Sequence, residues 1–315
     1  MSTPPPSLGA GVIPPLVTPC GPDGRVDPDG LALVVERVVL GGVHGIFVLG
    51  TTGEGPAFSL EQKKAVVSAA TAAAAGRLPV LVGVTDASFD GVRALTEHAA
   101  GAGAAATVLA PPPYSPTAGP ELIHYLDAVA EASPLPVFLY DIPSRTGAVP
   151  FEAVRHAMTL DRFVGFKDSS GRMVTLHEVI RERDAQRPGF KVLVGPEELL
   201  GEAVLFGADG GVAGGANLFP ELFVALYDAA AAGDLATVRR LHGVVMQVST
   251  TLYRAGQHGS SFIKSVKGAL AELGVCGGDL AMPYEGFHPG DRPRVKRLLE
   301  EAQAAVDGAL GAVAS

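Results

Sequence analysis

The chain has 315 residues, of which 47% are hydrophobic and 18% are charged, enough apolar material for one large core. Its 24 basic and 33 acidic residues give a net charge of −9 with no basic stripe, which argues against a nucleic-acid partner. No apolar run reaches the roughly 18 residues of a membrane-spanning helix, so we expect no membrane insertion.

Two features indicate a cytoplasmic protein. The only cysteines, Cys20 and Cys276, lie far apart in the sequence and are expected to be reduced thiols. The first residues lack the basic stretch and apolar core of a signal peptide. Residues 1–10 include three consecutive prolines and are expected to form a flexible tail.

Short β-branched runs alternate with longer Ala- and Leu-rich amphipathic segments from residue 11 to residue 232. The predicted strands are Val12–Thr18, Gly45–Gly50, Val80–Val84, Ala106–Ala110, Val137–Tyr140, Val164–Lys167, Val192–Gly195 and Gly211–Gly214. The predicted helices are Pro28–Leu40, Leu60–Ala75, Phe89–Ala102, Glu121–Ala132, Phe151–Met158, Val174–Arg183, Glu197–Phe206 and Pro220–Ala232. Ser59 with Gln62 forms a capping box in front of the second helix.

Eight strands that each precede a helix predict a closed (β/α)8 TIM barrel over residues 11–232. A doubly wound sheet is the alternative, but it normally carries a glycine fingerprint after its first strand, and here Pro19-Cys20-Gly21 follows. After Gly233 the strand pattern stops. Residues 233–315 are expected to form a C-terminal helical extension, with helices at Leu235–Ala255, Ser261–Leu273 and Arg292–Val306.

Lys167 ends the sixth predicted strand, after the apolar run from Phe163 to Phe166. Burial there would disfavour the ammonium and lower the lysine pKa from about 10.4. A neutral amine is a nucleophile, and its usual use is a Schiff base with a carbonyl substrate. A surface lysine at a strand end is the alternative interpretation.

Other strand ends carry polar residues that would gather at the same face of a barrel. After the second strand, the glycine-rich segment with Thr51 and Thr52 can hold a carboxylate, or can be an ordinary turn. After the fourth strand, Tyr114 lies in a proline-stiffened loop, where it can also simply pack on that loop. Tyr140 at the end of the fifth strand can transfer protons, and nearby Arg145 can bind a carboxylate; a core tyrosine and a surface arginine are the alternative.

Several further polar segments have a structural interpretation. Asp168 is expected to cap the following helix, and Glu197 and Glu198 to favour a helix first turn, although they could also face a polar substrate. The glycine-rich segment 210–217 should pass close to the pocket and could suit a phosphate-binding barrel. Eight histidines are scattered without ligand spacing, so no metal is predicted.

Three motifs occur in order: Gly50–Glu54, Leu139–Gly147 and Gly165–Asp168. Together they resemble the dihydrodipicolinate synthase/N-acetylneuraminate lyase family of pyruvate-dependent class I aldolases, and the likeness runs from about Gly11 to Pro289. The resemblance implies a (β/α)8 barrel with a C-terminal helical extension. It also implies a homotetramer or homodimer and no cofactor beyond a covalent imine.

The resemblance also implies roles for single residues. Lys167 forms the imine with pyruvate or another 2-oxo acid, and Tyr140 is the acid/base at the pyruvyl centre. Thr51 connects Tyr140 to Tyr114, which the family supplies from the neighbouring subunit.

Four residues are implied to bind substrate. Thr52, with the backbone around Gly53, holds the pyruvate carboxylate. Arg145 stands at the pocket mouth and binds the acid group of the aldehyde in the synthases. Ala213 matches a position whose backbone carbonyl lines the pocket.

The chain departs from the synthases at several positions. Asp141 replaces an asparagine, and Pro113 replaces the tyrosine that precedes Tyr114. The positions of the lysine-feedback pocket are occupied by Gly55, Leu60, Ala87 and Gly91. Feedback by lysine is therefore not expected.

The leading hypothesis that the family resemblance implies is a 4-hydroxy-tetrahydrodipicolinate synthase-like activity, which condenses pyruvate with aspartate semialdehyde. An aldolase or dehydratase for 2-keto-3-deoxy sugar acids, or an N-acetylneuraminate lyase-like aldolase, remains open, because a few side chains at the pocket rim decide the substrate. A barrel that binds a 2-oxo acid without turnover is the alternative from another class.

Overall fold

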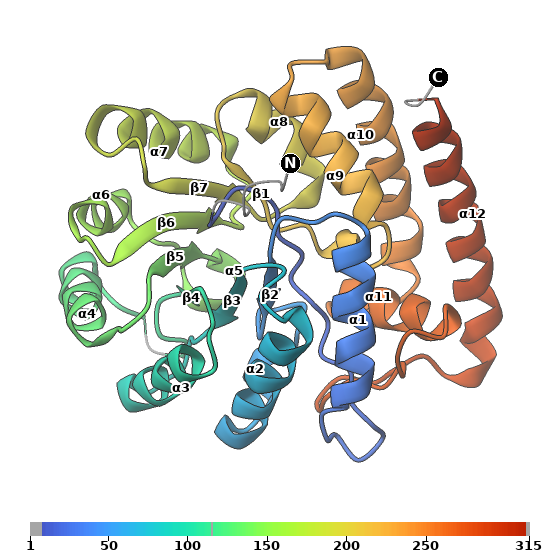
Figure 1. The fold of residues 1–315 in the computed structure, drawn as a ribbon, viewed down its shortest axis with the longest axis horizontal. Helices are drawn as coiled ribbons and strands as arrows, with labels where there is room; N and C mark the ends of the chain where they lie inside the picture. Colours follow the sequence, from blue (N-terminus) through green and yellow to red (C-terminus); the bar gives the residue numbers. More distant parts are fainter. Residues whose placement is uncertain (1–7, 115, 313–315) are drawn as a thin grey trace.

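The computed structural model describes residues 8–114 and 116–312, so most of the expected tail at residues 1–10 lies outside the described residues. Eight parallel strands form one sheet in the order β1-β8-β7-β6-β5-β4-β3-β2. A parallel bridge between Pro15 and Phe47 joins β1 to β2 and closes the sheet into a barrel. The predicted fold class is therefore confirmed (Figure 1).

The elements follow the predicted alternation. The strands are β1 Gly11–Val12, β2 Ile46–Val48, β3 Val80–Gly83, β4 Ala106–Leu109, β5 Val137–Asp141, β6 Phe163–Asp168, β7 Lys191–Val194 and β8 Gly210–Gly211. The helices around them are α1 Pro28–Leu40, α2 Leu60–Ala74, α3 Phe89–Gly101, α4 Gly119–Ala132, α5 Pro143–Thr146, α6 Phe151–Thr159, α7 Met173–Gln186, α8 Leu200–Leu205 and α9 Pro220–Ala231. The extension contains α10 Leu235–Thr250, α11 Ser261–Glu272 and α12 Arg292–Gly311. Short 3-10 turns occur along the whole chain: η1 Gly55–Ala57, η2 Glu197–Leu199, η3 Gly214–Asn217, η4 Leu252–Arg254 and η5 Pro289–Asp291.

The first and last strands are much shorter than predicted. Pro14 and Pro15 follow β1, and proline has no N–H group for a strand ladder. In β8, a Cβ atom on Gly210 would lie 2.0 Å from the carbonyl oxygen of Gly11, so only glycine lets these two backbones approach. The two shortest strands of the barrel therefore pair with each other through glycine backbone.

Helix signals in the sequence correspond to the observed caps. The capping box at Ser59 and Gln62 is present in front of α2. The predicted helix Glu197–Phe206 is wrong in its first turn, because residues 197–199 form the 3-10 turn η2 before α8 begins. The short helix α5 after Tyr140 was not predicted, because four residues are too few to show a helical period.

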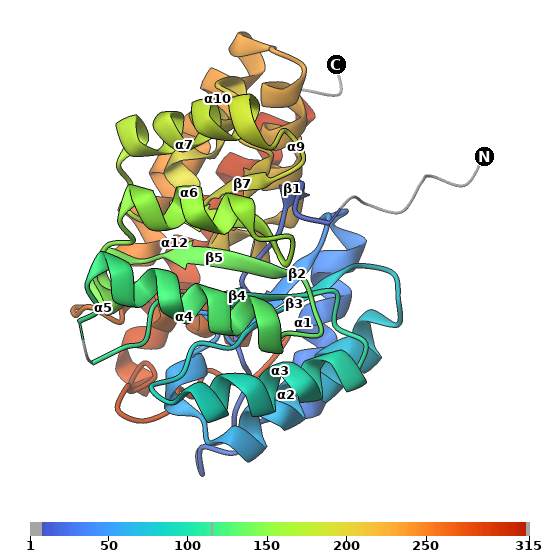
Figure 2. The same ribbon diagram turned by 90° about the vertical axis from the view of Figure 1, so that its left-hand side faces the viewer.

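The core has two parts. Inside the barrel, a cluster that includes Ile13, Phe47, Phe138 and Leu193 fills the space below the carboxyl ends of the strands. A larger cluster lies between the strands and the surrounding helices. In Figure 2, α3, α4 and α6 lie across the outer face of the barrel strands.

The extension shares the large cluster with the barrel. Val245 of α10, Leu270 of α11 and Leu299 of α12 belong to it together with barrel residues. In Figure 1 these helices lie beside α9 and α1. The proposed division at residue 233 stays a prediction, but no separate core distinguishes the two parts among the described residues.

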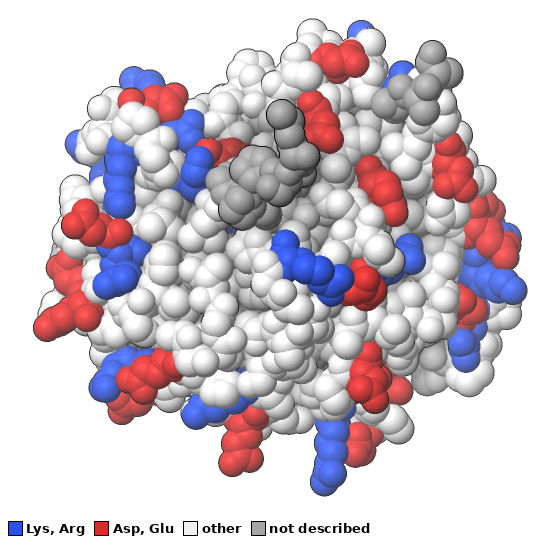
Figure 3. Space-filling model, viewed as in Figure 1, with Lys and Arg blue, Asp and Glu red and all other residues white. Residues whose placement is uncertain are grey.

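Three further expectations concern the whole chain. Cys20 and Cys276 are both free thiols. Within the described residues, no helix combines the length and the apolarity needed to span a membrane. The face in Figure 3 carries basic and acidic side chains interspersed.

Candidate active site

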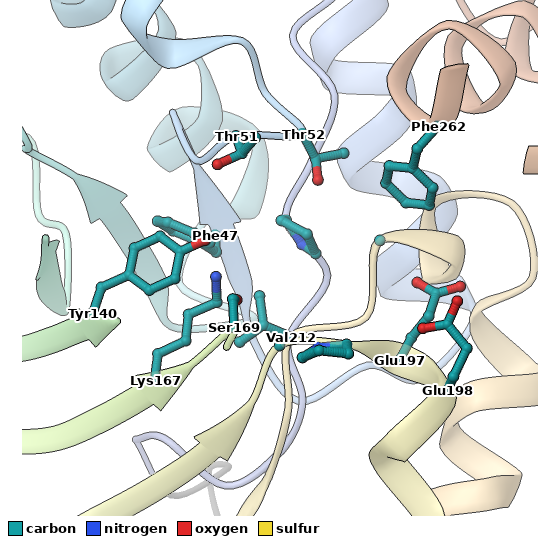
Figure 4. A pocket seen from close by; sticks show the side chains of 14 residues that line it. Phe47, Thr51, Thr52, Tyr140, Lys167, Ser169, Glu197, Glu198, Val212 and Phe262 are labelled. Carbon is teal, nitrogen blue, oxygen red and sulfur yellow. The ribbon is translucent and has the colours of Figure 1, made fainter. Parts of the chain in front are cut away.

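A cavity of about 250 Å³ opens at the carboxyl ends of the strands (Figure 4). Residues of β5 and β6 and the loops after β2, β6, β7 and β8 form its walls, together with α11 of the extension. Its polar lining side chains are Thr51, Thr52, Tyr140, Lys167, Ser169, Glu197 and Glu198. The cavity therefore gathers strand ends from most of the barrel, as predicted from topology alone.

Lys167 lies inside the cavity with only 5% of its surface exposed. Its Nζ atom is 3.5 Å from the centre of the Tyr140 ring and 5.3 Å from that of Phe47. Burial lowers the pKa of this lysine, and the nearby Tyr140 and Asp168 only partly oppose that effect. The amine can therefore lose its proton more easily than an exposed lysine, as a nucleophile must.

Tyr140 is the direct neighbour of Lys167 across the β5–β6 ladder. Burial would raise the pKa of its phenol, but the Lys167 ammonium and hydrogen bonds with Lys167, Ser169 and Thr51 outweigh burial and lower it. A phenol with a lowered pKa is suited to exchange a proton with a bound substrate.

Ser169 was not predicted as a site residue. It lies two positions after Lys167, so in an extended chain both side chains point to the same face. Its backbone N–H donates to the carbonyl of Asp141 at 2.8 Å, which continues the strand pairing beyond β6. The period of two along the strand was the signal that could have identified it.

Thr51 and Thr52 lie on the loop between β2 and η1, and both line the cavity. Gly53 lies behind them: its carbonyl accepts a hydrogen bond from Oγ1 of Thr18 at 2.7 Å, and a Cβ atom there would lie 2.7 Å from the carbonyl oxygen of Leu16. Gly53 does not line the cavity. We infer that it shapes the loop, which we call the threonine loop (residues 49–55).

Arg145 lies on α5 and is exposed. It lines a second cavity of about 520 Å³, which shares Phe47, Thr51 and Tyr140 with the first. It therefore lines the neighbouring cavity and not the cavity that contains Lys167.

Besides Gly53 and Arg145, two further predicted residues do not line the Lys167 cavity in this chain. Tyr114 is 99% exposed and has a positive φ of 76°. Ala213 is completely buried between Val212 and Gly214, which do line the cavity.

Glu197 has a different position from the helix first turn expected for it. The carboxylate turns inward and accepts hydrogen bonds from the Tyr253 hydroxyl and the Gly215 N–H, both at 2.6 Å. Burial raises the pKa of this carboxyl to about 7. Glu198 accepts a hydrogen bond from Ser249 and also lines the cavity. Tyr253 and Ser249 lie more than 50 positions later in the sequence, which is why no local pattern revealed these contacts.

Asp168 also differs from its predicted capping role. It is the last residue of β6, and its side chain accepts from the N–H of Ser170 at 2.6 Å, whereas α7 begins after Arg172. Asp141, which stands where the synthases carry asparagine, is buried and accepts from the N–H of Val149 at 2.9 Å. Both carboxylates therefore order local loops.

A metal site was not predicted. Among residues 8–114 and 116–312, no cluster of three or more His, Cys, Asp or Glu side chains could bind a metal ion. The chemistry available to the described site rests on an amine, a phenol, hydroxyls and carboxyls.

Comparisons with known proteins agree with the fold and the motifs. The profile of the Dihydrodipicolinate synthetase family matches residues 9–302. The chain is 34% identical to the probable 2-dehydro-3-deoxy-D-pentonate aldolase YjhH of Escherichia coli K12, over 76% of this chain and 80% of the relative.

Two solved structures are similar over nearly the whole chain. Dihydrodipicolinate synthase from Bacteroides thetaiotaomicron is 43% identical with a TM-score of 0.90, covering 93% of this chain and 99% of the other. YagE of E. coli K12 in complex with pyruvate is 29% identical with a TM-score of 0.88, covering 94% and 99%.

The fold and the matches define a lyase of the class I aldolase type. The chain belongs to the dihydrodipicolinate synthetase family.

Proposed function

We propose that Lys167 forms an imine with the carbonyl carbon of pyruvate or another 2-oxo acid. The observation that carries this proposal is the burial of the Lys167 amine, with a lowered pKa, against the Tyr140 phenol. The similar YagE structure is a complex with pyruvate, which supports the choice of ligand.

The remaining groups suit the chemistry that follows. A protonated imine withdraws electrons from the adjacent carbon, so that this carbon can lose a proton or a carbon–carbon bond. Tyr140 would move the proton, with Thr51 and Ser169 holding the phenol by hydrogen bonds. Thr52 and the backbone of the threonine loop would bind the 2-oxo acid carboxylate.

The imine can be tested directly. The protein is incubated with pyruvate and borohydride, and the intact mass and the modified peptide are determined. We expect a reduced pyruvyl adduct on Lys167 that is lost in Lys167→Ala. If pyruvate binds and no adduct forms, the chain is a binding protein without imine chemistry.

For the overall reaction, we propose that the enzyme splits a 2-keto-3-deoxy sugar acid, or forms one from a 2-oxo acid and an aldehyde. The observation in favour is that Glu197 and Glu198 share the cavity of Lys167. Two carboxyls beside the imine would hydrogen bond to hydroxyls of a sugar chain. The similarity to YjhH points to the same substrate class.

The synthase reaction with aspartate semialdehyde is the second candidate. It is favoured by Arg145, which lines a cavity that also contains Thr51 and Tyr140 and could bind a carboxylate. The similarity to a dihydrodipicolinate synthase supports the same candidate.

A substrate panel separates the two. Cleavage of 2-keto-3-deoxy sugar acids is compared with condensation of pyruvate and aspartate semialdehyde, in the parent enzyme, Glu198→Gln and Arg145→Ala. The sugar-acid proposal requires that the parent enzyme cleaves these acids. It also requires that cleavage is at least about tenfold slower in Glu198→Gln and is not slowed in Arg145→Ala. Condensation that depends on Arg145 alone would favour the synthase. Pyruvate trapping in all three proteins is the control.

A further inference from the structure

A fully buried ion pair joins the threonine loop to the helical extension. Neither of its residues lines the Lys167 cavity, although Glu54 lines the second cavity together with Arg145. Nζ of Lys267, on α11, is 2.8 Å from Oε1 of Glu54, and neither side chain has any exposed surface. Glu54 lies on the same loop, two residues after Thr52. The imine chemistry proposed above uses neither charge.

Both charged groups make further polar contacts. Oε2 of Glu54 accepts a hydrogen bond from the N–H of Ala281 at 2.7 Å. Lys267 donates to the carbonyl of Asp279 at 2.7 Å and lies 3.3 Å from Sγ of Cys20. The pair therefore connects the threonine loop to α11 and to residues 279–281, which belong to the helical extension.

The backbone of the loop is held in an unfavourable conformation. Leu49 and Glu54 have φ values of 61° and 54°, a region that residues with a side chain rarely adopt. The N–H of Glu54 donates to the carbonyl of Thr51 at 3.1 Å. A change in the position of Glu54 is therefore transmitted to Thr51, which lines the cavity.

We propose that Glu54 and Lys267 are positioning residues that hold Thr51 and Thr52 in place to bind the carboxylate of the 2-oxo acid. This inference rests on the proposed imine function. Through the pair, the helical extension sets the geometry of a site built by the barrel. A role in stability alone is a weak explanation, because apolar side chains can usually replace a buried ion pair without loss of stability.

Three variants test the proposal: Glu54→Gln, Lys267→Met and the double variant with both changes. Glutamine keeps the shape of Glu54 and an acceptor for Ala281, so it removes mainly the charge. Asp209→Asn is the matched control. It breaks the ion pairs of Asp209 with Arg183 at 2.7 Å and Lys191 at 2.9 Å, at the opposite end of the strands.

Two quantities are measured for each protein: the pyruvate concentration that half-saturates borohydride trapping on Lys167, and the midpoint of thermal unfolding. We expect Glu54→Gln and the double variant to raise the half-saturating concentration by about tenfold or more, because small displacements of binding groups are costly. The double variant should recover a higher unfolding midpoint than either single variant. Asp209→Asn should lower the midpoint and leave pyruvate trapping unchanged.

The outcomes separate this inference from the proposed function. If the parent protein forms no adduct, both are wrong. In a second outcome, the parent protein forms the adduct while Glu54→Gln and the double variant keep its half-saturating pyruvate concentration. In that case only the positioning role is wrong. An equal increase of the half-saturating pyruvate concentration in Asp209→Asn would also overturn the positioning role, since the increase would then follow the loss of stability. Should the single variants not fold, the double variant decides.

Discussion

At the scale of single residues, the site depends on groups whose proton affinity is changed by burial. Lys167 loses affinity for its proton because the ammonium is desolvated, and Tyr140 does so because that same ammonium lies next to its phenol. The proton affinity of Glu197 changes in the opposite direction, since burial favours the neutral carboxyl and raises its pKa. A nucleophile, a proton carrier and a partly protonated carboxyl can thus coexist near pH 7 in one cavity.

Replacing Tyr140 with phenylalanine removes only the hydroxyl. We expect Tyr140→Phe to form the imine but to turn over at least about tenfold more slowly, because a positioned general acid/base contributes about 10² to 10⁴ in rate. Borohydride trapping and steady-state turnover measure the two steps separately. Parental turnover in Tyr140→Phe would exclude the proton-transfer role.

The raised pKa of Glu197 predicts a pH-dependent stability. Between its ordinary pKa of 4.5 and the folded value of about 7, the folded protein holds a proton that the unfolded chain has released. The free energy of unfolding should therefore fall as pH rises through this window, by about 3 kcal/mol in total, and level off above pH 7.

Urea unfolding of the parent and of Glu197→Gln between pH 5 and pH 8 measures this dependence. The variant controls for all other titrating groups, so the difference between the two proteins should carry the predicted slope. Parallel curves would show that Glu197 is ionised throughout this range.

At the scale of elements, the strand ends were predictable and the strand lengths were not. Parallel β-branched runs with helices between them bring every carboxyl end to one face, which is why Thr51, Tyr140 and Lys167 could be grouped without coordinates. The contact of β1 with β8 depends on backbone approach at Gly210, and no hydrophobic pattern encodes that distance.

Substitutions of glycine by alanine at two sites test the close contact between β1 and β8. Gly210→Ala should destabilise the protein by more than about 3 kcal/mol or prevent folding, because the new Cβ would overlap the backbone of Gly11. Gly101→Ala in α3 is the matched control, since nothing lies within 4 Å of its Cβ position. It should be neutral or slightly stabilising. The midpoints of urea unfolding of the two variants are compared. Equal midpoints would show that the backbone contact of Gly210 with Gly11 does not require glycine.

At the scale of the whole molecule, the helical extension completes the site. It contributes Phe262 to the cavity wall and Tyr253 to the hydrogen bonds of Glu197. It also shares one apolar core with the barrel, so the two parts are expected to unfold together. The exposed Tyr114 with its positive φ suits the proposal that it completes the site of a neighbouring subunit.

Complementation tests this intersubunit role. Lys167→Ala and Tyr114→Phe should each be inactive or slow alone. When they are unfolded and refolded together in equal amounts, random pairing gives one intact site in each mixed dimer, hence about a quarter of parental activity. Activity that stays at the sum of the separate variants would show that Tyr114 does not act across an interface.

The sequence by itself determined the alternation of strands and helices, the barrel, and the strand-end residues Lys167, Tyr140, Thr51 and Thr52. These depend on local periodicity and on a topology that gathers strand ends at one face. Only the tertiary structure decided the roles of Glu197 and Glu54. Glu197 is hydrogen-bonded to Tyr253, which lies 56 residues away in the sequence. Glu54 is hydrogen-bonded to Ala281, which lies 227 residues away. Such contacts depend on how the extension packs against the barrel, and the burial that raises the pKa of Glu197 exists only after that packing has formed.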